Sequence, residues 1–312
     1  MPPSIVALAG GVGGAKLAHG LAQILPPEDL TVVVNTGDDF EHLGLHISPD
    51  LDTVMYTLAG LANPETGWGL RDESWNFLDA LGRLGGETWF RLGDRDLATH
   101  VERSHRLWAG ESLTEVTAAL CAALGVRMRV LPMTDDIFRT MVQTEGGELE
   151  FQEYFVHRRC EPRVTGFRFD GLGSAFPTEQ VLTALDAADV IIFCPSNPFV
   201  SLDPILSLPG VRERVGRKRA VAVSPIVGGQ AIKGPAAKMF AELGMEVTAA
   251  SVAAHYAGLL RGFVLDEVDA ELKPSIESDT LQVLVTNTVM RGDADRARLA
   301  REVLDFAIRA KQ

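Results

Sequence analysis

Short apolar runs rich in β-branched residues recur along the chain, and each is followed at once by small, polar or glycine residues. The five clearest runs are SIVALAGGVGG, LTVVVNTGDD, DVIIFCPSNP, RAVAVSPIVGG and LQVLVTNTVM. Their strand portions are almost continuously hydrophobic, which is typical of strands buried on both faces of a parallel sheet. The pattern therefore predicts a parallel sheet that is covered on both sides.

Segments with helical periodicity lie between these runs, at residues 16–25, 178–187, 204–215, 235–243 and 294–310. Strands that alternate with helices indicate a doubly wound α/β fold with a mostly parallel sheet. In such a fold, ligands bind outside the carboxyl ends of the strands, where the polar tails of the runs emerge. We therefore expect GGVGG, NTGDD, SNP and SPIVGG to be neighbours at one edge of the sheet.

Two regions depart from this alternation. Residues 52–127 are mostly helical in pattern and hold all four tryptophans, which predicts a helical cover over the crevice. Residues 128–172 include RTMVQTEGGELEFQEYFV, whose two alternating runs around Glu-Gly-Gly predict a small β-hairpin excursion. Since no repeat or low-complexity linker interrupts the chain, we expect a single domain over residues 1–312, with residues 1–51 and 173–312 as its nucleotide-binding α/β core.

Charge and cysteine content narrow the class of protein. The chain has 29 Lys and Arg residues against 42 Asp and Glu residues, a formal net charge of −13. Nucleic acid is not an expected partner, because it requires a clustered cationic face, and no run is long and apolar enough to span a membrane. The three cysteines form no CxxC pair, which favours a reducing, cytoplasmic location.

The run LAGGVGGAKLAHGL begins as a strand, passes through glycines and becomes a helix, which we expect to start near Ala15. Glycines allow a ligand to approach the backbone, and the free N–H groups at a helix start attract anions. Neither GxGxxG nor GxxxxGK[ST] is present. We predict that Gly11, Gly13 and Gly14 contact a phosphate; a tight turn without a ligand is the alternative.

The stretch NTGDDFEHLGLHISPDLDT gathers carboxylates just after the second strand. Clustered carboxylates raise one another's pKa unless a cation intervenes. Close to a phosphate they predict Mg²⁺, which takes one or two carboxylates together with phosphate oxygens. Asp39 and Asp52 are the predicted metal ligands, whereas helix capping is an equally good interpretation of Asp50.

Three further stretches supply candidate ligand contacts. WFRLGDRDLATH contains Arg91 among aromatic residues and alternating charges; it is either a solvated surface or a site where Arg meets a planar or phosphate group. The loops CPSNPFVS and SPIVGGQAIKGP combine hydroxyl, amide and glycine groups suited to a nucleotide. The candidates there are Ser196, Asn197 and Gly229, together with Asn35 at the end of the second strand.

Several long motifs, in this order, resemble the 2-phospho-L-lactate transferase family of coenzyme F420 biosynthesis. They are GGVGGAKLAHGL, VVVNTGDD, SPDLDTVMYTLAG, LGDRDLATH, VLPMTDD, FQEYFV, SNPFVSLDPIL and VAVSPIVGGQAIKGPAAKM. The resemblance spans about residues 5–290. It implies a Rossmann-like fold, a homodimer, and binding of the deazaflavin alcohol FO together with a guanylated donor, lactyl-2-diphospho-5'-guanosine or its enolpyruvyl analogue.

The implied reaction is attack of the terminal ribityl hydroxyl of FO on the donor phosphorus that carries the lactyl or enolpyruvyl group, with release of GMP. The family residues that contact FO match Asp52 and Arg91. We assign Asp52 to Mg²⁺ and to orienting the hydroxyl, with Asp39 as a second metal ligand or the base. The guanosine diphosphate (GDP) moiety is expected to lie among Gly11, Gly13, Gly14, Asn35, Ser196, Asn197 and Gly229.

The competing hypothesis is a non-catalytic nucleotide or nucleotide-sugar binder, similar to the gluconeogenesis-factor proteins that share the glycine-rich start and an NTGDD-like loop. The aromatic cover and LGDRDLATH favour the transferase, because a regulator needs no FO pocket. A nicotinamide-dependent oxidoreductase is disfavoured, since the dinucleotide fingerprint is absent and the second strand ends in Asn35 rather than an acid. The sequence leaves the donor open between lactyl, enolpyruvyl and glyceryl groups.

Overall fold

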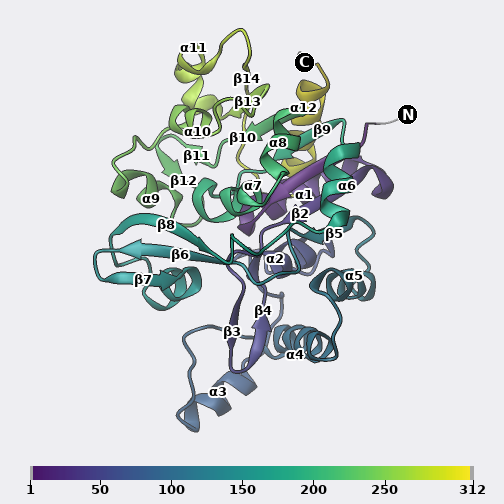
Figure 1. Cartoon of the computed structure of the whole chain (residues 1–312), viewed down its shortest axis with the longest axis vertical. Coiled ribbons are helices and arrows are strands. Elements are labelled where there is room, and N and C mark those ends of the chain that lie inside the picture. Colours follow the sequence, from purple (N-terminus) through teal and green to yellow (C-terminus); the bar gives the residue numbers. More distant parts are fainter. Residues whose placement is uncertain (1–2, 310–312) are drawn as a thin grey trace.

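The computed structural model describes residues 3–309 and is built around a seven-stranded sheet with helices on both faces (Figure 1). The strands lie in the order β14-β13-β10-β9-β1-β2-β5, and every neighbouring pair is parallel. Their bounds are β1 (Ile5–Ala9), β2 (Leu30–Val34), β5 (Arg129–Pro132), β9 (Val190–Phe193), β10 (Arg219–Val223), β13 (Gly262–Leu265) and β14 (Gln282–Val285). The chain order reverses between β1 and β9, which is where a Rossmann-like sheet opens a ligand crevice.

The hydrophobic runs form strands because both faces of the sheet are covered. In β1, Ile5, Ala7 and Ala9 face one layer of helices, while Val6 and Leu8 face the other, and all five are buried. The prediction of a doubly wound α/β fold is confirmed. Within residues 3–309, no helix combines the length and apolar character needed to cross a membrane.

Two sets of helices cover the two faces. One face packs against α1 (Gly11–Ile24), α2 (Pro49–Leu58), α5 (Leu113–Ala123) and α12 (Asp293–Arg309). The other packs against α6 (Glu179–Ala187), α7 (Asp203–Ser207), α8 (Val211–Gly216), α9 (Ala236–Glu242) and α10 (Ala249–His255). The remaining short elements are η1 (Pro27–Asp29), η3 (Pro198–Leu202), β11 (Ile226–Val227), β12 (Gln230–Ala231), η4 (Glu267–Leu272) and α11 (Lys273–Ile276).

Two helix predictions need correction. The helix expected near Ala15 begins at Gly11, so the glycine run forms its first turn. The segment expected as one helix over residues 204–215 is two short helices, because Pro209 cannot continue a helix and Gly210 adopts a φ of 76°.

The helical cover is mixed in structure. In the predicted cover range, residues 52–127, α2 and α5 pack against the main sheet, and only α3 (Asn76–Arg83) and α4 (Asp94–Trp108) with their connections lie beyond it. They are joined there by the hairpin of β3 (Phe40–His42) and β4 (Leu45–Ile47), which falls in the predicted core range 1–51 and which the sequence pattern had not indicated. This hairpin and residues 59–112 form the cover. Figure 1 shows this hairpin, α3 and α4 extending below the central sheet. A small cluster of Phe40, Ile47 and Leu92 joins the hairpin to the loop before α4.

The β excursion differs from the predicted range of residues 128–172. Its first part, β5, pairs with β2 in the main sheet, so the excursion starts later. It contains three antiparallel strands in the order β7-β6-β8, with β6 (Arg139–Thr144), β7 (Gly147–Glu150) and β8 (Val164–Asp170). The hairpin around Glu-Gly-Gly is present, but FQEYFV is helical and includes the π-helical turn η2 (Glu153–His157).

Candidate active site

A cavity of about 690 Å³ lies at the carboxyl ends of β1 and β9, at the position where the strand order reverses. The core, the cover and the β excursion all contribute to its wall. Its lining residues include Gly10, Gly11, Gly13, Lys16, Asp38, Asp50, Asp52, Tyr56, Thr66, Trp68, Trp89, Phe90, Arg91, Asp96, His100, Phe151, Gln152, Phe155, Ser196, Asn197 and Lys233. A cavity of this size is typical of small-molecule and cofactor sites.

The first turn of α1 forms the floor beside β1. Gly11 adopts a φ of 61°, which favours glycine, and its N–H donates to the Asp50 carboxylate at 2.6 Å. A Cβ at Gly13 would lie 2.3 Å from the carbonyl oxygen of Pro195. The glycines therefore allow α1 to pack against the loop after β9, and the start of the helix faces the cavity.

The loop after β9 is fixed to this turn. The Ser196 hydroxyl accepts from the Gly10 N–H at 3.0 Å and donates to the Gly10 carbonyl oxygen at 2.8 Å. Asn197 caps the following turn by accepting from the N–H of Phe199, and it also lines the cavity. The ends of the two central strands thus form one continuous wall.

Two buried carboxylates, those of Asp38 and Asp50, face the cavity beside the glycine turn. The Asn35 amide donates to both, at 3.1 and 2.9 Å, and Gln152 donates to Asp38 at 2.9 Å. Burial raises the pKa of Asp50 to about 6, against the hydrogen bonds from Asn35 and Gly11. Burial and the charges of Asp50 and Asp39 also raise the pKa of Asp38. This pair is suited to sharing a cation or a proton.

A third buried carboxylate, that of Asp52, has a different environment. Both of its oxygens accept from the guanidinium of Arg103, which is 1% exposed, in a bidentate pair. The His100 ring lies beside the same carboxylate, with Nδ1 at 3.6 Å from Asp52 Oδ2. Burial raises the pKa of Asp52, and the Arg103 and His100 charges limit that rise. Asp52 is therefore a carboxylate neutralised by the protein itself.

Aromatic side chains line the opposite part of the cavity. Trp89 and Phe90 come from the cover, and Phe151 and Phe155 come from the β excursion, where their rings stack at 5.4 Å. The Arg91 guanidinium lies over the Trp75 ring, 4.1 Å from its centre. These flat apolar surfaces and the planar cation can hold a flat conjugated ring.

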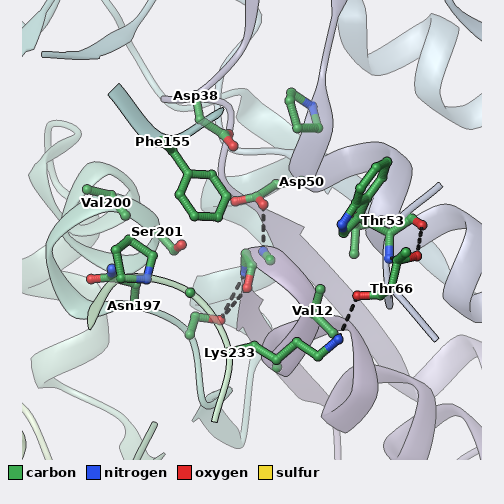
Figure 2. A pocket seen from close by; sticks show the side chains of 18 of the residues that line it. Val12, Asp38, Asp50, Thr53, Thr66, Phe155, Asn197, Val200, Ser201 and Lys233 are labelled. Atoms are coloured by element: carbon green, nitrogen blue, oxygen red, sulfur yellow. Dashed lines mark hydrogen bonds between the residues drawn. The ribbon is translucent and has the colours of Figure 1, made fainter. Parts of the chain in front are cut away.

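Two ammonium groups face the cavity near the glycine turn. Lys16 donates to the Met290 carbonyl oxygen at 3.1 Å, and Lys233 donates to the carbonyl oxygens of Glu65 at 3.2 Å and Thr66 at 2.7 Å. Figure 2 shows the hydrogen bond from Lys233 to Thr66. Neither lysine pairs with a carboxylate within residues 3–309. Burial lowers the pKa of Lys16, and the nearby Arg296 and Lys233 charges lower it further, so positive charge gathers here.

A family model described as 2-phospho-L-lactate transferase CofD matches residues 5–302. The chain belongs to this family. A phosphoenolpyruvate transferase from Streptomyces griseus is 44% identical over 311 residues, covering 97% of this chain and 98% of the relative. A 2-phospho-L-lactate transferase from Methanosarcina acetivorans is 38% identical over 304 residues, with coverage of 97% and 98%. These similarities establish a transferase of this family.

The fold is also similar to a solved structure. The crystal structure of a UPF0052 family member from Bacillus halodurans matches with a TM-score of 0.62 and 15% sequence identity. The match covers 97% of this chain and 99% of that chain. At this level of identity it supports the Rossmann-like fold and nothing about the reaction.

Six of the ten site residues predicted from the sequence line the cavity. They are Gly11, Gly13, Asp52, Arg91, Ser196 and Asn197. The other four, Gly14, Asn35, Asp39 and Gly229, are not among its lining residues. Asn35 nevertheless holds the Asp38 and Asp50 carboxylates in place.

Asp39, an expected metal ligand, does not line the cavity. Its carboxylate accepts from the Ser48 hydroxyl at 2.7 Å and lies 3.1 Å from His46 Nε2, so it braces the β4–α2 junction. The neighbouring Asp38 faces the cavity instead. Two adjacent residues of one loop point in different directions, and the sequence could not distinguish them.

Sequence reasoning missed Lys16, Lys233 and Arg103. Lys16 had one available signal, because it is a cation one turn after a glycine-rich helix start in a chain of net charge −13. Arg103 and Lys233 gave no local signal, since their partners are 51 and 167 residues away.

Proposed function

We propose that the protein transfers a 2-phospholactyl or phosphoenolpyruvyl group from a guanylated diphosphate donor to the ribityl hydroxyl of FO and releases GMP, as a step of coenzyme F420 biosynthesis. The main support is one cavity with two different parts. One part holds the glycine turn of α1 with two nearby ammonium groups, and the other is an aromatic wall with the Asp52 carboxylate beside it. The first part suits a diphosphate, and the second suits a flat ring with a hydroxylated side chain.

The donor end is the glycine turn with its surroundings. A diphosphate there meets the start of α1 and the ammonium groups of Lys16 and Lys233, which together favour negative charge. Ser196 and Asn197 offer hydroxyl and amide groups to the rest of the nucleotide. Lys233 links the core to the cover, so it closes the cavity over a bound donor.

The acceptor end lies between the cover and the β excursion. The deazaflavin ring packs against aromatic faces such as Trp89 and Phe155, and the Arg91 guanidinium contacts its polar edge. The ribityl chain then extends toward Asp52, whose carboxylate accepts a hydrogen bond from a hydroxyl. This arrangement brings an alcohol and a phosphorus centre together, which is the main requirement for transfer.

In the transfer step, the hydroxyl oxygen forms a bond to the phosphorus that carries the lactyl or enolpyruvyl group, and the hydroxyl proton ends on the phosphate of the departing GMP. The bond from that phosphorus to the bridging oxygen breaks, and GMP leaves with this oxygen. Negative charge accumulates on the phosphoryl oxygens, so the nearby Lys16 and Lys233 ammonium groups stabilise the transition state.

We also propose that the reaction depends on Mg²⁺, which would be held by Asp50 and Asp38 rather than by the expected ligands Asp39 and Asp52, because Asp52 is already paired with Arg103. Both carboxylates line the cavity beside the glycine turn, and neither pairs with a cationic side chain within residues 3–309. No group of three or more potential ligand side chains gathers there in the described chain, but Mg²⁺ needs only one or two carboxylates with phosphate oxygens. The ion would neutralise diphosphate charge.

The test is to incubate the purified protein with FO, Mg²⁺ and each of the lactyl, enolpyruvyl and glyceryl donors, and to identify products by mass. Formation of one coupled product together with an equal amount of GMP is expected. Binding of guanine nucleotide without any coupled product would favour the non-catalytic binder. A change in FO fluorescence on mixing measures acceptor binding independently of turnover.

A further inference from the structure

A buried network of polar side chains joins α2 to α4 behind the acceptor end of the cavity. Asp52 and Tyr56 lie one turn apart on α2, and Asp96, His100 and Arg103 follow one face of α4. All five are at most 7% exposed. The Tyr56 hydroxyl donates to Asp96 Oδ1 at 2.8 Å, and His100 Nε2 lies 3.4 Å from the same oxygen.

Arg103 differs from the other four members because it does not line the cavity. Its two terminal nitrogens bind the two oxygens of Asp52, and Nη1 also lies 3.2 Å from His100 Nδ1. A guanidinium fork fixes both the position and the plane of a carboxylate, which a single ammonium group cannot do.

We infer that Arg103 is a positioning residue for the transfer: it acts through Asp52, whose plane it fixes so that the free lone pairs face the acceptor hydroxyl. Each carboxylate oxygen has two lone-pair sites, and the guanidinium uses one on each. One site remains on each oxygen, and Asp52 lines the cavity. This inference rests on the proposed function, in which Asp52 accepts a hydrogen bond from FO.

A purely structural role is the alternative, because the same pair also holds α2 against α4. The two roles differ in what a conservative change does. Arg103→Lys keeps the positive charge next to Asp52 but loses the fork. If Arg103 only neutralises Asp52, the lysine variant should retain activity; if it fixes the plane of the carboxylate, the lysine variant should lose acceptor recognition specifically.

The experiment uses the full chain with Arg103→Lys, Asp52→Asn and the double variant. Arg106→Lys is the matched control, because Arg106 lies on the same helix and pairs with Glu111 at a partly exposed position. For each protein, kcat and the KM of each substrate are measured, together with FO affinity by fluorescence and the midpoint of thermal unfolding. All kinetic measurements are made well below that midpoint.

Arg103→Lys is expected to lower kcat/KM for the acceptor by at least about tenfold and to weaken FO binding, while the donor KM stays within about twofold of the parent value. In the Asp52→Asn background the same change should have no further effect, since Arg103 acts through that carboxylate. Arg106→Lys should change neither the donor kinetics nor the acceptor kinetics.

Equal acceptor kcat/KM for Arg103→Lys and Arg106→Lys would overturn the inference. So would a further fall in kcat/KM when Arg103→Lys is added to Asp52→Asn, or an equal fall in kcat/KM for the donor and the acceptor. If the parent protein formed no product with any donor, the proposed function would fail. The FO titration would still decide on Arg103: weaker binding by Arg103→Lys alone supports the inference, and unchanged binding contradicts it.

Discussion

Asp50 and Asp52 lie two residues apart on α2, yet they belong to two ends of the cavity that are built differently. At the core end, Asp50 accepts hydrogen bonds from the backbone of Gly11 and the amide of Asn35, which are neutral donors. At the cover end, Asp52 is bound by the guanidinium of Arg103. One buried carboxylate has a counter-ion within the protein, and the other has none among residues 3–309.

The difference indicates what each end requires from a ligand. A buried carboxylate without a counter-ion is costly in its charged form, and it is relieved by a proton or a cation. The core end is thus suited to a metal-bound diphosphate. At the cover end, Asp52 already has Arg103 as its counter-ion, so a neutral hydroxyl can bind there without a change in net charge. Variants at the two positions should separate these properties.

Asp52→Asn is expected to have the largest effect. It removes the oriented acceptor for the FO hydroxyl and should lower kcat/KM for transfer roughly 1,000-fold. It also leaves the buried Arg103 without its counter-ion, so the free energy of unfolding should fall by about 3–5 kcal/mol. Steady-state kinetics and chemical denaturation measure the two effects.

The control for Asp52→Asn is Asp186→Asn, which breaks the surface pair between Asp186 and Arg214. A surface pair of this kind contributes at most about 1 kcal/mol, and no activity should be lost. Near-normal turnover of Asp52→Asn would remove Asp52 from the mechanism. Unchanged stability would show that the ion pair with Arg103 does not support the cover.

Asp50→Asn should have the next largest effect, with a different signature. The asparagine oxygen can still accept from Gly11, but the side chain loses its charge, so kcat/KM should fall roughly 100-fold and the Mg²⁺ requirement should rise. The new NH₂ group and the Asn35 NH₂ group are both donors, which destabilises the fold, whereas the loss of an unpaired buried charge stabilises it. These opposing effects should leave the free energy of unfolding within about 1 kcal/mol of the parent value.

Equal destabilisation by Asp50→Asn and Asp52→Asn would contradict the different charge environments of the two carboxylates. Titration with Mg²⁺ after chelation tests the metal separately. Wild-type turnover should be lost on chelation and restored by Mg²⁺, and undiminished turnover in excess chelator would contradict the proposed ion.

The core and the cover also differed in how far they could be predicted from the sequence. β1, β2, β9 and β10 were predicted because burial on both faces leaves a continuous apolar run, and the partly buried edge strand β14 was predicted from its apolar run VLV. β5 and β13 were not named, since RVLP and GFVL are short and are interrupted by proline, arginine or glycine. The core-end residues Gly11, Ser196 and Asn197 could be predicted because each follows a strand whose carboxyl end is fixed by the sheet.

The cover could be predicted only in outline. Its hairpin β3–β4 is two strands of three residues, too short to show an alternating pattern. The partnership of Arg103 with Asp52 depends on how α4 packs against α2, and the distinction between Asp38 and Asp39 depends on the loop after β2. Such contacts follow from tertiary packing, so no local motif contains them.

Lys233→Ala tests the link between the two ends and should have a smaller effect. It removes the hydrogen bonds to the Glu65 and Thr66 carbonyl oxygens and one cation near the diphosphate (Figure 2). We expect the donor KM to rise about tenfold with little change in the acceptor KM, and the effect to shrink at high salt.

The matched control for Lys233→Ala is Lys218→Ala, because Lys218 also donates to a backbone carbonyl oxygen, that of Asp186, but lies outside the cavity. It should leave both KM values unchanged. A rise in the acceptor KM alone would place Lys233 at the other end of the cavity.

Asp94→Ala tests the cover by itself and should have the smallest effect on turnover. Asp94 accepts from the N–H of Phe77 at 2.9 Å, from the Ser74 hydroxyl at 2.7 Å, and from the backbone and side-chain amides of Asn76, so it ties the start of α3 to α4. These hydrogen bonds lower the pKa of Asp94 to about 2 from 3.8. A carboxylate with a depressed pKa stabilises the fold above its unfolded pKa, and that stabilisation is lost as the pH falls toward its folded pKa.

The thermal midpoint of Asp94→Ala should therefore lie a few degrees below the parent value at pH 7, and the difference should stay constant down to about pH 4 and shrink below it. The acceptor KM should rise slightly while the donor KM stays constant, because Trp75 and Arg91 come from the segments on either side of α3, which belong to the cover. If the difference between the parent and variant midpoints increased below about pH 4, it would contradict the stabilisation of the charged Asp94 carboxylate. An equal rise in both KM values would mean that the cover and the core respond as one unit, and the two ends of the cavity would then not be independent.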